Sequence, residues 1–127
     1  MGQCYGVYTG SMKPQKYSAK DITRVDLGSK VIHKYPTPTK RYDIARMVVK
    51  GRFPKDNQYT YNSVCDFFIF VLEGTGKVYA GDEIFEVKPQ DIVFVPKKNK
   101  YAVDGYFSYV TIDVPAFYDD QAQIVSE

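Results

Sequence analysis

The stretch that decides the fold runs from Asp66 to Tyr101 and reads DFFIFVLEGTGKVYAGDEIFEVKPQDIVFVPKKNKY. Its opening run, with Cys65 in front, is almost entirely apolar and predicts a strand that is buried on both sides or central in a sheet. The glycines of the GTG triplet at 74–76 predict a turn. Beyond them, Gly81-Asp82 joins KVYA to EIFEV as a β-hairpin. The segment KPQD then turns the chain into the strand IVFV.

The flanking sequence continues the same pattern of short strands and Gly- or Pro-based turns. No amphipathic helix is evident, so the chain predicts an all-β barrel or sandwich. Residues 1–20 are expected to form an N-terminal arm, and residues 21–127 a single β-barrel domain. The C-terminal tail is expected to hold one helical turn or to pack across the barrel. The other expected strands are 21–34 (two short strands around Gly28), 44–49, 101–103 and 106–114, the last two split by Asp104-Gly105. A period-2 pattern over 59–66 also predicts a strand that continues into the apolar run after Cys65.

The composition limits the classes of function. The net charge is +2, from 17 basic and 15 acidic residues, which is too balanced to indicate nucleic-acid binding. The two cysteines, Cys4 and Cys65, do not form a disulfide framework and are expected to be reduced in a cytoplasmic protein. No apolar run reaches the roughly 18 residues of a membrane helix, and no signal peptide is visible. The start MGQCYG lacks the Ser or Thr of a myristoylation signal at Gly6, so lipidation is not expected.

The run VLEGTGKVYAGDEIFEVKPQDIVFVP resembles the cupin family of jelly-roll barrels (double-stranded β-helices). The first cupin motif resembles G-x5-H-x-H-x(3,4)-E-x6-G, and its closing glycine corresponds to Gly74. The second resembles G-x5-P-x-G-x2-H-x3-N, and its proline corresponds to Pro96. Gln90 and Lys98 stand where that motif has glycines. The resemblance spans roughly residues 44–114 and implies a cupin-like jelly-roll barrel with an N-terminal extension.

The same alignment leaves the usual metal ligands without counterparts. Phe67 stands at the position of the family's glutamate, and Tyr101 at that of the second-motif histidine. The first-motif histidine pair falls on Thr60 and Asn62 or on Tyr61 and Ser63, depending on the spacer. A divalent metal needs imidazole and carboxylate donors that converge. We therefore expect no metal and no other cofactor, and we do not transfer the metal-dependent oxygenase chemistry of cupins to this chain.

Strand alternation suggests what lines the barrel instead. If Phe67 faces inward, then Cys65, Ser63 and Tyr61 share that side unless a bulge intervenes. On the strand 44–49, Arg46 brings a cation to the pocket or lies on a wet outer face, and Lys50 shares its parity. The predicted ligand pocket suits a small molecule that is sugar-like or partly apolar. Its predicted residues are Tyr61, Ser63, Cys65, Phe67, Tyr101 and Arg46.

Several of the residues that could line a pocket or take part in chemistry also have a purely structural interpretation. Phe67, Phe68 and Phe70 are most simply core and interface side chains. Cys65 is typical of a buried small hydrophobe, since no histidine lies near it in the sequence to activate the thiol. His33, the single histidine, is more often a surface residue than a catalytic one.

Two functions remain open from the sequence. The first is a metal-independent cupin-like protein that binds a small molecule without chemistry. The second is a metal-independent isomerase or epimerase acting on a sugar or sugar nucleotide. In that case Tyr101 or Tyr61 would serve as the acid, and His33 or an acidic residue not identified from the sequence would serve as the base. We rank binding above catalysis, because an unperturbed tyrosine is a poor base at neutral pH. A metalloenzyme with atypical ligands is the third possibility. We reject it because the residues at the ligand positions are not the imidazole and carboxylate donors that a divalent metal needs.

The expected partners are a small-molecule ligand and a second copy of the chain. A jelly roll exposes edge strands, and small cupins are commonly dimers that pair them, so a homodimer is expected. The N-terminal arm could add a strand to a neighbouring subunit. No nucleic-acid or membrane partner is expected.

Overall fold

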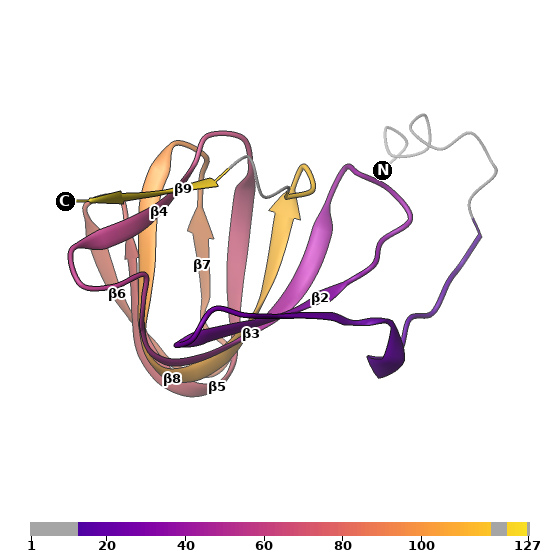
Figure 1. Cartoon of the computed structure of the whole chain (residues 1–127), viewed down its shortest axis with the longest axis horizontal. Coiled ribbons are helices and arrows are strands. Elements are labelled where there is room, and N and C mark those ends of the chain that lie inside the picture. The colour runs from indigo at the N-terminus through magenta and orange to yellow at the C-terminus, as the bar shows by residue number, and fades with distance from the viewer. Residues whose placement is uncertain (1–12, 118–121, 127) are drawn as a thin grey trace.

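The structure is a computed structural model that describes residues 13–117 and 122–126 (Figure 1). Predictions about Cys4 and the start of the N-terminal arm lie outside these residues. Antiparallel strands make up almost all regular structure in the described ranges, where no helix is long and apolar enough to cross a membrane. The elements are η2 (Ala19–Asp21), β1 (Thr23–Asp26), β2 (Lys30–Tyr35), β3 (Asp43–Phe53), β4 (Gln58–Asn62), β5 (Asp66–Ala80), β6 (Glu83–Val87), β7 (Ile92–Val95), β8 (Asn99–Val114) and β9 (Ala122–Ser126).

Two long strands, β5 and β8, form the centre of the sheet. They pair with each other along almost their whole length, and both bend through a U in Figure 1. The other edge of β8 is covered first by β4 and then by β3, and the other edge of β5 by β6 and β7. The hairpin β1–β2 extends the sheet beyond β3. The C-terminal β9 pairs with β4, so the described end of the tail, residues 122–126, adds a strand to the sheet.

The bend explains two differences from the sequence-based prediction. The GTG triplet does not turn the chain, because β5 runs through it with a bulge between Val71 and Glu73. Asp104-Gly105 does not split the last strand either, since β8 is continuous. Gly76 and Gly105 face each other across β5 and β8. A Cβ atom on Gly76 would lie 2.5 Å from Cε1 of Phe107, and one on Gly105 would lie 2.6 Å from the Cα of Gly76. These glycines allow the two backbones to approach closely while both strands bend.

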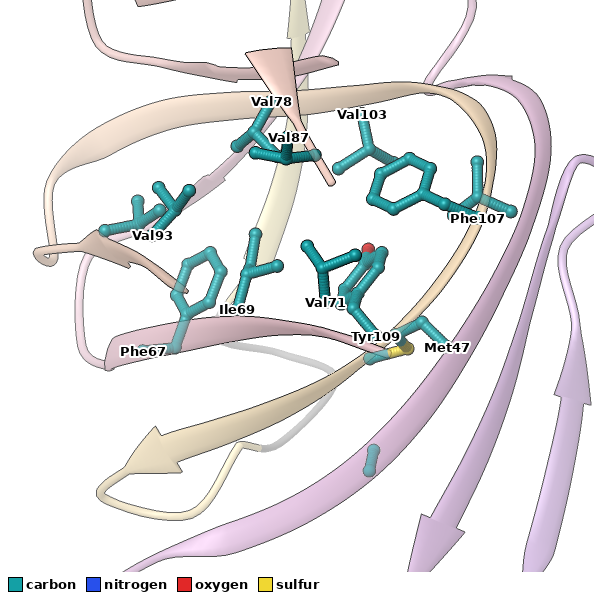
Figure 2. Close-up of a cluster of buried hydrophobic side chains, with 13 residues drawn as sticks. Met47, Phe67, Ile69, Val71, Val78, Val87, Val93, Val103, Phe107 and Tyr109 are labelled. Atoms are coloured by element: carbon teal, nitrogen blue, oxygen red, sulfur yellow. The ribbon is translucent and has the colours of Figure 1, made fainter. Parts of the chain in front are cut away.

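The inward-facing side chains of β5 and β8 fill one end of the barrel with an apolar core. Figure 2 shows the side chains of both strands pointing toward those of β6 and β7. Ile69 and Val71 on β5 are fully buried, and Phe107 and Tyr109 on β8 are almost so. The ring centroids of Phe107 and Tyr109 lie 5.3 Å apart. This part of the interior is packed solid.

The backbone supports the alignment of the second motif. Gln90 and Lys98, which replace its two glycines, both adopt positive φ, at 76° and 67°. Their amides are hydrogen-bonded in these conformations, to the carbonyl oxygens of Val71 at 2.9 Å and Asn62 at 2.8 Å. Positive φ is uncommon for residues other than glycine. The chain thus keeps the turn geometry of the motif without the residue type that adopts it most easily.

Candidate functional site: a polar cavity at one end of the barrel

The other end of the barrel encloses a cavity of about 370 Å³. Its wall is largely apolar and includes Phe53, Phe67 and Tyr109. The hairpin β1–β2 closes one side, and Ile124 on β9 contributes to another. The polar side chains that reach the cavity are Lys30, Lys34, Asp43, Thr60, Asn62, Tyr101, Thr111 and Asp113.

Two aspartates on adjacent strands form the polar centre of this cavity. Asp43 on β3 and Asp113 on β8 are directly opposite in the antiparallel register, and their side chains are hydrogen-bonded. Burial, followed by the hydrogen bond and the charge of Asp43, raises the pKa of Asp113 to about 8. The charges of Lys30 and Lys34 act in the opposite direction. Near neutral pH the pair therefore holds one proton, with Asp113 donating to the Asp43 carboxylate.

The remaining contacts of Asp43 orient the pair. One carboxylate oxygen, Oδ2, accepts the backbone N–H of Phe117 at 2.8 Å. The same oxygen lies 3.4 Å from Nζ of Lys34, which also donates to the carbonyl oxygen of Phe117 at 3.2 Å. Asp43 is almost fully buried, whereas Asp113 keeps part of its surface exposed. Asp43 is thus the anchored member of the pair, and Asp113 is the one more available to a ligand.

Thr111 lies one inward position before Asp113 on β8 and has an unused hydroxyl. It is 4% exposed, and its Oγ1 has no hydrogen-bond partner among the described residues. A buried hydroxyl without a partner is destabilising. A ligand in the cavity would supply the missing hydrogen bond.

Phe67 and Tyr101 form an aromatic wall on another side of the cavity. Their ring centroids are 4.6 Å apart, and the rings are inclined by 60°. Burial, and then the charge of Asp113, raises the pKa of Tyr101, while the neighbouring Thr60 opposes the shift. Tyr101 therefore stays protonated at physiological pH and can donate a hydrogen bond. Both residues lie where the sequence alignment places them, at the cavity wall.

The other residues predicted for the pocket do not line the cavity. Tyr61 faces away from it, because its neighbours Thr60 and Asn62 point inward, and Ser63 is exposed. Arg46 lies between the inward-facing Ala45 and Met47 and so points outward. Cys65 is buried beside the C-terminal loop, with Sγ 3.1 Å from the carbonyl oxygen of Pro115.

His33 and the Cys65 thiol are poorly suited to chemistry in the cavity. On β2, Lys30, Ile32 and Lys34 line the cavity, so His33 faces the other way, opposite Arg24 and Arg46 on the neighbouring strands. Desolvation and the two arginines lower its pKa. Burial raises the pKa of Cys65 to about 11, with the charge of Asp113 adding to the shift. The thiol is therefore protonated at neutral pH.

A turn explains why alternation from Phe67 does not extend back to Tyr61. The side-chain oxygen of Asn62 accepts the backbone N–H groups of Val64 at 2.7 Å and Cys65 at 2.8 Å. This Asx-type turn ends β4 before β5 begins, so the two strands have independent parity. Thr60 and Asn62, rather than Tyr61 and Ser63, therefore face inward.

The cavity side chains do not fit a divalent metal of the kind that cupins commonly hold. Phe67 has no donor atom, and the carboxyls of Asp43 and Asp113 are hydrogen-bonded to each other. Within residues 13–117 and 122–126, no three His, Cys, Asp or Glu side chains gather as a ligand set. We therefore derive no step through a metal.

Sequence reasoning missed Lys30, Asp43, Thr111 and Asp113. A signal for two of them was present in the segment YFSYVTIDV at 106–114. In this segment every second residue faces the same side of the strand. Phe107 and Tyr109 face inward, so Thr111 and Asp113, two and four positions after Tyr109, face inward as well. The positions of Lys30 and Asp43 depend on how β2 and β3 pair with β8, which alternation within one segment does not specify.

Comparison with solved structures places the barrel among cupin-like folds. No family model matches the chain, and no curated protein matches it. Streptomyces PAC13, described as a nucleoside dehydratase, is 19% identical with a TM-score of 0.79, over 90% of this chain and 92% of that one. A PAC13 variant solved with uridine gives a TM-score of 0.80 at 20% identity, over 91% of this chain and 93% of that one. Oxalate decarboxylase from Bacillus subtilis gives 0.75 at 12% identity, over 90% of this chain and 32% of that one. At such identities the likeness establishes the fold, which is the cupin-like barrel expected from the sequence.

Proposed function

We propose that this chain binds a small hydroxylated molecule inside the barrel, without a metal. The observation that carries the proposal is the unpartnered Thr111 hydroxyl, buried in the wall of a cavity of about 370 Å³. Ligand sites are typically cavities of about 300–1,000 Å³ with mainly apolar walls and a few convergent polar groups. Phe67 and Tyr101 supply an aromatic wall for a sugar or base ring, and Thr111 and Asp113 supply polar contacts.

The similarity in fold to PAC13 suggests a first probe. Because structures of that protein were solved with uridine, uridine is a reasonable test molecule for a barrel of similar fold. We would screen uridine, ribose and glucose by ligand-observed NMR. We expect at least one of them to bind.

A matched pair of variants separates binding inside the barrel from binding outside it. Ala45 is 5% exposed and lines the cavity, so Ala45→Phe fills the space. Ile44, next to it on β3, faces outward and is 36% exposed, so Ile44→Phe adds the same ring outside. Binding should be lost in Ala45→Phe and kept in Ile44→Phe. If nothing in the screen binds, or if binding survives Ala45→Phe, the proposal is wrong.

Acid–base catalysis is the second candidate, and the aspartate pair favours it. A metal-independent isomerase or epimerase needs a base, which the sequence did not identify. Asp113 holds a proton near neutral pH and becomes a base as the pH rises toward its pKa of about 8. Tyr101 would act as the acid. His33 and Tyr61, the alternatives from the sequence, point away from the cavity. In a protein that only binds, Tyr101→Phe should weaken binding by a few-fold, consistent with one lost hydrogen bond. If turnover is found and is lost in Tyr101→Phe while binding remains, catalysis is the function.

The outer face of the sheet supports a homodimer. Two adjacent rows of side chains cross β3, β8, β5 and β7 on the outside. One row contains Ile44, Ile112, Phe68 and Phe94, and the next contains Arg46, Val110, Phe70 and Ile92. Phe68 and Phe94 pack against each other with centroids 5.0 Å apart. We call the seven apolar residues of these two rows the outer apolar face.

The outer apolar face is large enough to form the centre of an interface with a second copy of the chain. Phe94 is 49% exposed and Ile92 61%, and the two phenylalanines of β5 are each about two-fifths exposed. Side chains of this size carry ~150–250 Å² each, so the exposed fractions add to several hundred Å². That is near the largest patch of a typical monomer, and a stable dimer buries ~800 Å² per partner. We propose that two copies pack by this face, in addition to or in place of edge pairing. We also place the protein in the cytoplasm, where the buried Cys65 would remain reduced.

A further inference from the structure

Lys30 is the most unusual charged residue in the described structure. It begins β2, is 6% exposed, and lines the cavity. Its Nζ lies 5.0 Å from the centroid of the Phe53 ring. A buried ammonium group is costly, and burial lowers the pKa of Lys30 to about 8, although the charge of Asp113 opposes the shift. Roughly a tenth of Lys30 is therefore a neutral amine at pH 7, and about half at pH 8.

Lys34 lies on the same face of β2 but differs from Lys30 in its exposure and its partners. Its side chain is 41% exposed, and it forms an ion pair with Asp43 and a hydrogen bond to the carbonyl of Phe117. Lys34 therefore acts as a charged partner that orients the aspartate pair. Lys30 differs from it in being enclosed against an aromatic ring in the cavity wall.

We propose that Lys30 is a nucleophile that forms an imine with a small aldehyde or ketone bound in the cavity. The inference deepens the function proposed above and rests on it, because the carbonyl compound must first enter the barrel. Its basis is geometric: an enclosed amine, a cavity of suitable size, and a carboxyl pair and an unused hydroxyl in the same wall. Desolvated lysines in apolar pockets are suited to this chemistry.

The groups in the cavity balance the reaction. The Nζ lone pair adds to the carbonyl carbon, a C–N bond forms, and the electron pair of the C=O bond moves to oxygen. That oxygen takes the proton that Asp113 holds, which gives a carbinolamine. The nitrogen then returns a proton to Asp113. The hydroxyl leaves as water when Asp113 protonates it, and the nitrogen lone pair closes the C=N bond as an iminium ion. The iminium nitrogen then returns its proton to Asp113. The net change is amine plus carbonyl to imine plus water, with Asp113 unchanged.

The test is reductive trapping with a small aldehyde. We would incubate the intact protein with glycolaldehyde or glyceraldehyde and sodium cyanoborohydride, and locate adducts by intact mass and peptide mapping. An amine of pKa about 8 has a neutral fraction at pH 7 that is roughly three-hundredfold above that of ordinary lysines, and its lower intrinsic nucleophilicity reduces the advantage. We expect Lys30 to be labelled at least tenfold faster than the exposed lysines, with a rate that rises as the pH approaches 8.

Variants make the result specific. Lys30→Arg should abolish the selective adduct, and Lys50→Arg, which changes an exposed lysine on the outside of β3, should leave it unchanged. Lys30→Met replaces the buried amine with an apolar chain and serves if Lys30→Arg does not fold. Ala45→Phe should block labelling at Lys30 but not at exposed lysines.

The outcomes separate the two proposals. Labelling spread evenly over exposed lysines, or an adduct that persists in both Lys30 variants, would overturn the imine inference. If uridine or a sugar binds in the cavity and Lys30 is still not trapped, the imine inference falls and the binding function stands. If nothing binds and Lys30 is not trapped, both fall.

Discussion

Replacing Asp113 with asparagine tests whether the aspartate pair holds a proton at neutral pH. The pKa of Asp113 is raised from 3.8 to about 8 by burial and by Asp43. In this range the folded protein binds a proton that the unfolded chain has released, so its contribution to stability is present at low pH and is lost as the pH rises through about 8. One pKa unit corresponds to ~1.4 kcal/mol, so the three pH units from 5 to 8 set a ceiling of about 4 kcal/mol. Because Asp43 and cavity water would solvate part of the charge, we expect roughly 2–3 kcal/mol.

The asparagine side chain in Asp113→Asn would keep the shape and the hydrogen bond to Asp43 but would not titrate. We would measure the free energy of unfolding by urea denaturation at pH 5, 6, 7 and 8. The stability of Asp113→Asn relative to the unsubstituted protein should rise across this series by that amount. Asp104→Asn, on the same strand but outside the cavity, should show no such trend. The lowered pKa of Lys30 affects stability mainly between about pH 8 and 10.5, above the measured range. In that interval it makes the free energy of unfolding rise with pH, the opposite direction to Asp113. Parallel pH profiles for Asp113→Asn and the unsubstituted protein would refute the shared proton.

Three further predictions follow from single features of the structure. Thr111→Val should raise the stability of the unliganded protein by about 1 kcal/mol in urea denaturation, since it removes a buried hydroxyl without a partner, and it should weaken any cavity ligand. A loss of stability would mean that the hydroxyl is satisfied. Lys98→Gly should stabilise by roughly 0.5–1 kcal/mol because it relieves a positive φ of 67°, with the exposed Lys88→Gly, at a position without positive φ, as a destabilising control. Phe70→Lys should convert the proposed dimer to a folded monomer in sedimentation velocity, whereas Ile84→Lys on β6 should not. A monomeric mass before any substitution would exclude the dimer.

The sequence predicted those parts of the fold that depend on local patterns. The hairpin at Gly81-Asp82 and the two strands around Gly28 are confirmed, because turn chemistry and short apolar runs are encoded within a few residues. The bends at 74–76 and at Gly105 were mistaken for turns and breaks. The same glycines that end a strand elsewhere here let β5 and β8 bend while their pairing continues, and only the long-range contact between Gly76 and Gly105 distinguishes the two cases.

The site was less predictable than the fold, for the same reason. Phe67 and Tyr101 line the cavity, because the motif spacing fixes their place on β5 and β8, and their contact with a ligand stays a prediction. The aspartate pair arises from the register of β3 against β8, and Lys30 from the register of β2 against β3. These strands are far apart in the sequence, and each aspartate alone is indistinguishable from an ordinary surface carboxylate. The chemistry of this cavity becomes visible only when the sheet is assembled.

The most direct test of the central claim is to locate a bound small molecule on the protein by heteronuclear NMR. With the best binder from the sugar and nucleoside screen, the account predicts saturable shifts for the amides of Thr111, Asp113 and Phe67, which surround the cavity. It predicts no comparable shifts for Phe70 and Ile92 on the outer apolar face. Shifts confined to the outer face or to exposed loops, or no saturable shift for any molecule in the screen, would contradict the claim that this cavity is the functional site.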